Sequence, residues 1–538
     1  MKTTIGPQSP DLEEKGKQGI PAKLYAADMP RVQLILLLLG LSTVTFLFAL
    51  DQTVVATAQP KIAADFQAFG LISWIATAYL LPTTALQPFY GKISDIFGRQ
   101  LVMLYCVTIF VIGSVVCAAA PSMIALIIGR VVAGVGGAGL LNLCFIILSD
   151  MTTERERTSY MNIINLVFVI TDCLGPLIGG VFTDSVTWRW CFWINLIAYP
   201  FIAIIIVRYI KLPIPGGTLQ EKLKRIDFLG MSTMTIFLVA FLLAMSWGGT
   251  EYAWNSPMII SLLVVTAVFI VAFVLIEHYV AREPVLPLRL LQWKFRNFPI
   301  ILIARAATFF ILFAVVFYIP LYFQIVHQSS AIISGIHLFP FLFGACISSL
   351  FANYLTKRFG IYRSLNIAGL GVLAIAMGLT STLSRSSNLG QQIGYLLIGG
   401  LGFGLTTQTQ LIAAQAGVRR QDIGTVTAVA NMMCNLGGCI SIAVIGSIIG
   451  NIFETKVTAQ MAGLDVVINA LSPEVLAKLT IDQRIIVVDA YVEAIQNGFR
   501  FLLGVALFGF VTCFGLEHRQ LGDSKREDDE GDSTQVEV

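Results

Sequence analysis

Runs of about twenty apolar residues recur along nearly the whole chain, and each run is long enough to cross a lipid bilayer as a helix. Of the 538 residues, 56% are hydrophobic and only 12% are charged, about half the charged share of an ordinary soluble domain. A soluble fold of this size could not hide so much apolar surface. The sequence therefore predicts an all-α polytopic membrane protein. We expect no cleavable signal peptide, because residues 1–31 are polar and the first apolar run is too long for a signal core.

The polar breaks between the apolar runs predict fourteen membrane spans. They lie near 33–55, 71–90, 101–119, 122–148, 159–184, 190–208, 228–247, 257–277, 297–320, 331–355, 364–384, 392–411, 425–451 and 495–516. Most lysines and arginines outside the spans fall in the segments that lie on the same side as the N-terminus. The six on the other side are Lys61, Arg189, Arg385, Lys456, Lys478 and Arg484. Because positive charge marks cytoplasmic loops, both termini are expected in the cytoplasm.

Residues 91–100 (Gly-Lys-Ile-Ser-Asp-Ile-Phe-Gly-Arg-Gln) form a charged stretch between two apolar spans. We interpret it as a short turn of a tight antiparallel hairpin, in which Gly91 and Gly98 let the backbone turn sharply. Asp95 and Arg99 stand four residues apart, so they can pair with each other or with a neighbouring helix end. We expect this pair to hold one conformation of the protein.

Four charged residues lie well inside predicted spans: Asp51, Arg130, Asp172 and Arg305. Charges inside a membrane are expensive, so each is a candidate for function as well as for a structural pairing. An arginine stays charged and needs a carboxylate, a carbonyl or water as its partner. Burial of either acid would favour its protonated form, which a proton carrier requires.

Several motifs resemble those of fourteen-span drug:proton antiporters of the major facilitator superfamily, in particular fungal members, including vacuolar basic amino acid transporters. Residues 91–100 resemble the superfamily's signature loop, although Gln100 replaces a basic residue. Residues 50–60 resemble the first-span motif, with Leu-Asp followed by Thr, a β-branched pair and a closing Pro.

Gly175, Pro176, Gly179 and Gly180 match part of a fifth-span motif, in which Asn162 and Thr171 replace earlier glycines. Cys434 stands where relatives often have an arginine. The break Lys357-Arg358-Phe359-Gly360 echoes residues 95–98, as expected of a duplicated carrier.

The resemblance implies two six-helix bundles and two extra central helices, and we divide the chain accordingly. The parts are a cytoplasmic tail (1–32), an N-terminal bundle (33–210), a linker with two helices (211–296), a C-terminal bundle (297–516) and a cytoplasmic tail (517–538). A long outward loop is expected at 452–494, with a short interfacial helix or a disordered loop at 472–490.

The resemblance also assigns roles to individual residues. It implies that Asp51 lines a central cavity and binds a proton or a cationic substrate, with Asp172 as the second choice. Arg130 is tied to proton coupling, and Arg305 joins this coupling set. The glycines and Pro176 would bend span five and pack it against the opposite half. A further set of polar residues could contact a ligand or, for the tyrosines, anchor at the membrane interface: Tyr318, Tyr322, Gln324, Gln408, Gln410 and Asn431.

The leading functional hypothesis is proton-coupled antiport, exporting a drug-like or metabolite solute by alternating access across the plasma membrane. The alternative is a vacuolar carrier of basic amino acids, and a third possibility is a non-transporting membrane sensor. The cysteine and histidine spacings suggest no metal site, and no phosphate-binding loop appears. We therefore expect no enzyme activity, cofactor or nucleic-acid partner, and a monomer whose partners are lipid, protons and a small molecule.

Overall fold

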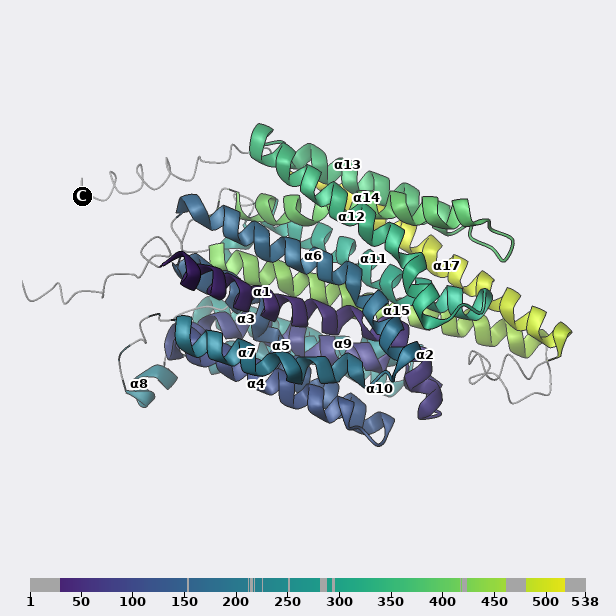
Figure 1. Cartoon of the computed structure of the whole chain (residues 1–538), viewed down its shortest axis with the longest axis horizontal. Coiled ribbons are helices and arrows are strands. Elements are labelled where there is room, and N and C mark those ends of the chain that lie inside the picture. The colour runs from purple at the N-terminus through teal and green to yellow at the C-terminus, as the bar shows by residue number, and fades with distance from the viewer. Residues whose placement is uncertain are drawn as a thin grey trace, which may run out of the picture.

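The computed structural model describes residues 30–517 except 152–153, 211, 213–215, 217, 225, 250–251, 281–287, 293–295, 417, 419–422 and 461–479. Within these residues the fold is helical, and the helices run roughly along one direction as a bundle (Figure 1). The first half contains α1 (Arg31–Thr53), α2 (Val55–Asp65), α3 (Trp74–Phe97), α4 (Arg99–Ala118), α5 (Met123–Met151), α6 (Glu154–Ser185) and α7 (Trp190–Tyr209).

The remaining helices comprise a connecting set and a second half. The connecting set is α8 (Leu219–Lys224), α9 (Phe228–Trp247) and α10 (Pro257–Tyr279). The second half is α11 (Asn297–Val326), α12 (Ala331–Phe359), α13 (Tyr362–Thr380), α14 (Leu389–Gln415), α15 (Ile423–Gln460) and α17 (Ile481–Cys513).

Twelve of the described helices are long and apolar enough to cross a membrane, which agrees with the predicted class of protein. Helices α3 and α6 lie in the same bundle at two further predicted spans. Each predicted span coincides with one long helix, and the connecting pair α9–α10 falls where the two extra helices were predicted. The count of fourteen membrane crossings stays a prediction.

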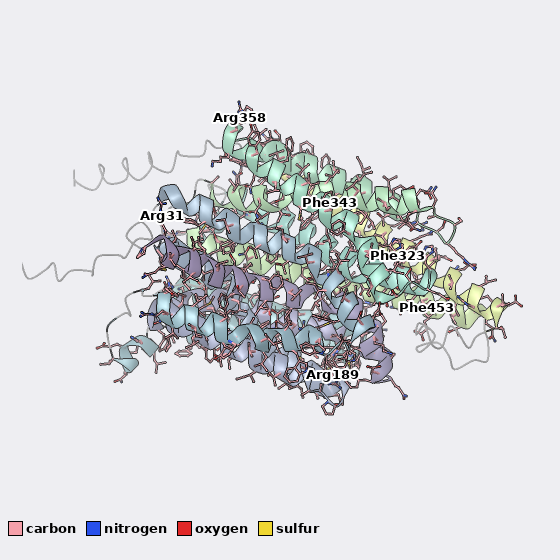
Figure 2. The ribbon with its side chains drawn as sticks, viewed as in Figure 1. Arg31, Arg189, Phe323, Phe343, Arg358 and Phe453 are labelled. Carbon is pink, nitrogen blue, oxygen red and sulfur yellow. The ribbon has the colours of Figure 1, made fainter. Side chains whose placement is uncertain are left out.

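The bundle has two distinct ends. We call the one that holds Arg31 and Arg358 the terminal end, because the described chain begins there, and the one that holds Arg189 and Phe453 the far end (Figure 2). The sequence predicts that the terminal end faces the cytoplasm.

The two halves meet along two seams, α6 against α12 and α3 against α15. Helix α9 packs against α10 and also against α3 and α15, so it covers the second of these seams. A cavity lies between the halves, so helices from both seams contribute side chains to the candidate site.

The structure corrects the prediction of a ten-residue turn at 91–100. Helix α3 continues through Phe97, and α4 begins at Arg99. Gly98 is the one residue between them, with φ +99°, a backbone conformation that glycine adopts without strain. Gly91 is therefore helical, and its carbonyl oxygen accepts a hydrogen bond from Arg99 Nη1 at 3.2 Å. Charged residues were mistaken for a loop because they end a helix that extends beyond the apolar run.

The predicted outward loop at 452–494 is also wrong in extent. Helix α15 runs to Gln460 and α17 starts at Ile481. The two extensions pack on each other through Phe453 and Tyr491, whose ring centroids are 6.2 Å apart in a T-shaped pair. Lys456 and Glu493 add an ion pair at 3.1 Å. Residues 481–490, expected in a separate interfacial helix, continue into the last long helix, and 472–479 lie outside the described residues.

Candidate functional site

Asp51 and Arg130 form an ion pair inside the first half. Arg130 Nη1 lies 2.5 Å from Asp51 Oδ2, and the two side chains are 1% and 0% exposed. Arg130 Nε also donates to the carbonyl oxygen of Ile75 at 2.9 Å, and Asn195 Nδ2 lies 3.4 Å from the other carboxylate oxygen. The guanidinium therefore finds the partners that a buried arginine requires. Four helices, α1, α3, α5 and α7, meet at this pair.

Local sequence explains how so large a cation is accommodated on α5. Gly134 and Gly137 let α3 approach closely: an added Cβ would overlap Tyr79 O at Gly134 and would lie 2.5 Å from Tyr79 Oη at Gly137. Tyr79 in turn lies under the guanidinium of Arg130, 4.4 Å from ring centroid to Cζ. The ring offers a cation–π contact in place of water. Gly137, Tyr79 and Arg130 therefore belong to one packing unit.

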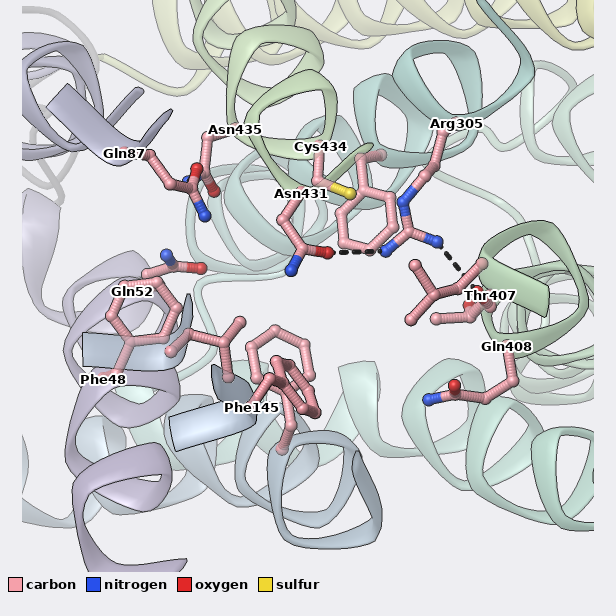
Figure 3. Close-up of a pocket in the computed structure, with 14 residues that line it drawn as sticks. Phe48, Gln52, Gln87, Phe145, Arg305, Thr407, Gln408, Asn431, Cys434 and Asn435 are labelled. Carbon is pink, nitrogen blue, oxygen red and sulfur yellow. Dashed lines mark hydrogen bonds between the residues drawn. The ribbon is translucent and has the colours of Figure 1, made fainter. Parts of the chain in front are cut away.

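A central cavity lies between the halves (Figure 3). Its volume is about 40 Å³, room for about three water molecules. Its lining comes from α1, α3, α5, α6, α11, α14 and α15: Phe48, Gln52, Gln87, Leu141, Phe145, Phe168, Arg305, Phe309, Thr407, Gln408, Leu411, Asn431, Cys434 and Asn435. The lining thus combines phenylalanine rings, side-chain amides and one arginine, and Asp51 is absent from it.

Among the described residues, Arg305 is held by neutral oxygens and not by a carboxylate. Its Nε donates to Ala430 O at 3.1 Å, its Nη1 to Thr407 O at 3.0 Å and its Nη2 to Asn431 Oδ1 at 3.1 Å. The residue is 4% exposed, and the Phe309 ring lies 5.4 Å from its Cζ. Every acceptor that the structure describes for Arg305 is a neutral oxygen.

Amide side chains connect Arg305 to the first half. Asn431, which accepts from Arg305, donates to Asn142 Oδ1 on α5 at 3.2 Å. Asn142 Nδ2 donates to the carbonyl oxygen of Gln87, and Asn435 Nδ2 donates to Gln87 Oε1 at 3.0 Å. We call these five residues the amide bridge. It joins α11 and α15 of the second half to α3 and α5 of the first.

The residues predicted to line a cavity divide into two groups. Gln408 and Asn431 line it. The others bond to neighbouring elements: Tyr318 donates to Ile442 O, Tyr322 to Ser384 O, Gln324 to Ser334 and Gln410 to Thr308. These four residues are absent from the lining of this cavity, which corrects the prediction for this conformation, although Gln410 Oε1 has no hydrogen-bond partner.

Two further observations qualify the predicted site. The backbone of Asp172 lies in α6, and its side chain lies outside the described residues. The sequence reasoning missed Gln52, Gln87 and Asn435, each a lone amide inside an apolar span. The signal that could have found them is that a polar side chain within a span usually faces the protein interior.

The Gly-Pro motif of α6 packs against α2 and the opposite half. A Cβ on Gly180 would meet the backbone of Ile332 at 2.7 Å, so only glycine fits there. Near the same point, Asp184 Oδ2 accepts a hydrogen bond from the Ile332 amide at 2.8 Å. Pro176 O accepts a hydrogen bond from Thr57 Oγ1 at 3.1 Å. The contacts of Gly180 and Asp184 with Ile332 hold the α6–α12 seam together toward the far end.

Arg99 organises the terminal end of the first half. It forms an ion pair with Asp95 and another with Asp150, at 3.0 Å from Nε to Oδ2. The side chain also donates to Ser94 Oγ at 2.5 Å. Asp150, at the end of α5, was not among the predicted residues. The cluster ties α3, α4 and α5 together, so both pairings expected for Arg99 exist at once.

Comparison with known proteins places this arrangement in a family. Residues 41–442 match the family model described as Major Facilitator Superfamily. The efflux pump dotC of Dothistroma septosporum is 36% identical over 424 residues, 79% of this chain and 72% of that protein. The MFS-type efflux pump MFS1 of Arthroderma benhamiae is 34% identical over 439 residues, 81% of each chain.

Among solved structures, a bacterial homologue of the human lysosomal transporter Spinster in an inward-facing and occupied conformation superposes with a TM-score of 0.61. It is 15% identical, and the match covers 90% of this chain and 97% of that one, which supports the fold alone. The family match covers most of the chain, and the helices, the two halves and the cavity between them agree with it. The chain belongs to the major facilitator superfamily and is a membrane transporter of the secondary type.

Proposed function

We propose that this transporter is a proton-coupled antiporter that exports a small organic solute from the cytoplasm. The observation that carries the proposal is the buried Asp51–Arg130 pair in the first half. A carboxylate that is paired when charged and buried when neutral can change its partner on protonation. Protonation of Asp51 would remove the negative charge that Arg130 now compensates, so the contacts between α1 and α5 would change.

A short path connects this pair to the cavity. Gln52 follows Asp51 on α1 and lines the cavity, whereas Asp51 itself does not. We therefore place the competition between proton and solute in a coupling through α1 rather than in direct occupation of one carboxylate. The reciprocity of linked equilibria then requires that solute binding disfavours protonation of Asp51 as strongly as protonation disfavours solute.

The α6–α12 contacts support the alternating-access part of the proposal. Backbone-to-backbone packing at Gly180 and Ile332 suits a far end that is closed in this conformation. Opening that end requires the two backbones to separate, and the terminal end would close in exchange. We further propose that the terminal end faces the cytoplasm, as the distribution of lysine and arginine predicts.

Export is favoured over the uptake of basic amino acids into a vacuole. The relatives reported above are named efflux pumps. In the part of the lining that the structure describes, the charged residue is Arg305, which would repel a cationic amino acid. We accordingly retain the vacuolar carrier only as an outcome of the experiment below.

The test is uptake into proteoliposomes that contain the purified protein and carry an imposed pH gradient, with an aromatic acid, a cationic drug, lysine and arginine as solutes. We expect an organic solute to accumulate, and this accumulation should stop when an ionophore dissipates the pH gradient. Accumulation of lysine and arginine alone would favour the vacuolar alternative. Solute movement that ignores the gradient would contradict proton coupling.

A further inference from the structure

The central cavity has an unusual balance of hydrogen-bond donors and acceptors. Arg305 is the one charged side chain among the described residues that line it. A guanidinium carries five N–H groups, and the three hydrogen bonds of Arg305 all end on neutral oxygens. A buried cation without a counter-charge is costly, and an anion that enters the cavity would remove that cost.

Gln52 supplies a second, independent observation on the opposite side of the cavity. Its side chain is 5% exposed, and its Nε2 has no hydrogen-bond partner. Figure 3 shows the Gln52 amide across the cavity from Arg305, with Asn431 between them. An unpartnered buried amide donor is rare in folded proteins and needs an acceptor. Two donors on facing walls therefore call for a ligand rich in oxygen acceptors.

The rest of the lining indicates what else the ligand must contain. Four phenylalanine rings come from both halves: Phe48, Phe145 and Phe168 from the first, and Phe309 from the second. Such walls favour a flat apolar ring system. A small hydrophilic anion would gain nothing from them.

We propose that the cavity binds an aromatic organic anion, a carboxylate or phenolate on an apolar ring system, with its acidic oxygen on Arg305. This proposal rests on the transport function proposed above and names the class of its solute. It departs from the expectation of a cationic solute bound at Asp51. In this conformation the cavity of about 40 Å³ is smaller than one aromatic ring, so binding requires the halves to move apart.

The amide bridge links the same binding event to that movement. Arg305 now donates to Asn431, which also bonds to Asn142 in the first half. A carboxylate accepts a stronger hydrogen bond from guanidinium than a neutral amide oxygen does. An anion that takes over this N–H releases Asn431 and weakens the connection between the halves. Solute binding would thereby favour the conformational change that carries it across.

The test compares three probes with one ring system: 2-naphthoate, 2-naphthylmethanol and 2-naphthylmethylammonium. Binding is measured at neutral pH, without a pH gradient, to the purified full-length protein in nanodiscs of phosphatidylcholine. Because charge-assisted hydrogen bonds contribute about 1.5–3 kcal/mol, we expect naphthoate to bind at least about tenfold more tightly than the ammonium probe. Tighter binding of the ammonium probe would overturn the proposal.

Variants then locate the effect. Arg305→Gln should weaken naphthoate binding at least about tenfold and leave naphthylmethanol nearly unchanged. Arg305→Lys should retain part of the preference, which keeps the test valid if the glutamine variant fails to fold. The control is Arg500→Gln, which removes the same charge from an exposed position on α17. Unchanged naphthoate affinity in folded Arg305→Gln or Arg305→Lys protein would contradict the assignment.

The role of Asp172 is tested in the same assay, since its side chain lies outside the described residues. If Asp172→Asn makes naphthoate bind markedly more tightly, that carboxylate compensates Arg305 in the wild-type protein, and Arg305 is not a free anchor for an anion. Unchanged preference supports Arg305. The assay contains no gradient, so a failure of proton coupling would leave these results intact. Conversely, gradient-driven transport of cations alone would refute an aromatic anion as the solute and remain consistent with antiport.

Discussion

Among the described residues, each half buries one arginine in the first third of a long helix, and the two arginines have different partners. In the first half Arg130 lies 2.5 Å from Asp51, sealed from the cavity among α1, α3, α5 and α7. In the second half the hydrogen bonds that the structure describes for Arg305 end on neutral oxygens, and Arg305 lines the cavity. A paired charge that is sealed away can respond to a proton, whereas an unpaired charge at a cavity wall can respond to a solute. If the proposed antiport is correct, the proton and the solute are handled in different halves.

Removing one member of the Asp51–Arg130 pair should have the largest effect. Arg130→Met leaves a buried carboxylate uncompensated, and such losses cost about 3–5 kcal/mol. Combining it with Asp51→Leu should restore most of the stability and still leave the protein without coupled transport. Thermal unfolding of the wild-type protein, Arg130→Met and the double variant in one detergent gives the comparison. A double variant no more stable than Arg130→Met would indicate that the pair is not the relevant unit.

Arg130→Lys tests whether position or shape of the charge matters. The guanidinium bonds to Asp51 and to Ile75 O simultaneously, whereas an ammonium is a compact point charge. We expect gradient-driven accumulation to fall at least about tenfold, because that factor corresponds to the free energy of about one charge-assisted hydrogen bond. Solute binding should be less affected. Parallel assays of uptake and binding measure both. Wild-type uptake would reduce Arg130 to a generic buried cation.

Arg305→Met should show the opposite balance, with a smaller loss of stability and a larger loss of solute binding than the Arg130 variants. Its partners are neutral oxygens, so the stability loss should be about 1–3 kcal/mol, less than for Arg130→Met. Solute binding should suffer more than in the Arg130 variant. Equal destabilisation by the two substitutions would erase the difference between the halves on which the comparison rests.

The smallest expected effect lies outside the cavity. Asp95→Asn removes one of two carboxylates that hold Arg99 at the terminal end, and Asp150→Asn removes the other. Because both acids are partly exposed, each loss should cost about 1 kcal/mol or less in stability. We expect a several-fold slower transport rate with unchanged equilibrium binding of solute. Wild-type rates in both variants would show that the cluster does not control a conformational step.

Most of the fold could be predicted from sequence because hydropathy alone marks where a helix crosses a membrane. The prediction from hydropathy failed where a helix extends past its apolar run: at Gly91–Phe97, at the end of α15 and at the start of α17. Polar residues in those segments resemble loops. The candidate charges were found because a charge within a span is rare. The pairing of Asp51 with Arg130, 79 residues apart, depends on how the helices pack. Lone amides such as Gln52 carry no charge, so a search for charges within spans missed them.

The central claim is that Asp51 couples the proton and Arg305 holds the solute, and two kinds of flux through the same proteoliposomes separate them. Solute counterflow exchanges labelled for unlabelled solute and needs no net proton movement. Gradient-driven accumulation needs both solute binding and proton movement. Asp51→Asn should keep counterflow and lose accumulation, and Arg305→Gln should lose both. An Asp51→Asn protein that still concentrates solute in response to the pH gradient would contradict the account, and the proton would then belong to Asp172 or to no acid in the spans.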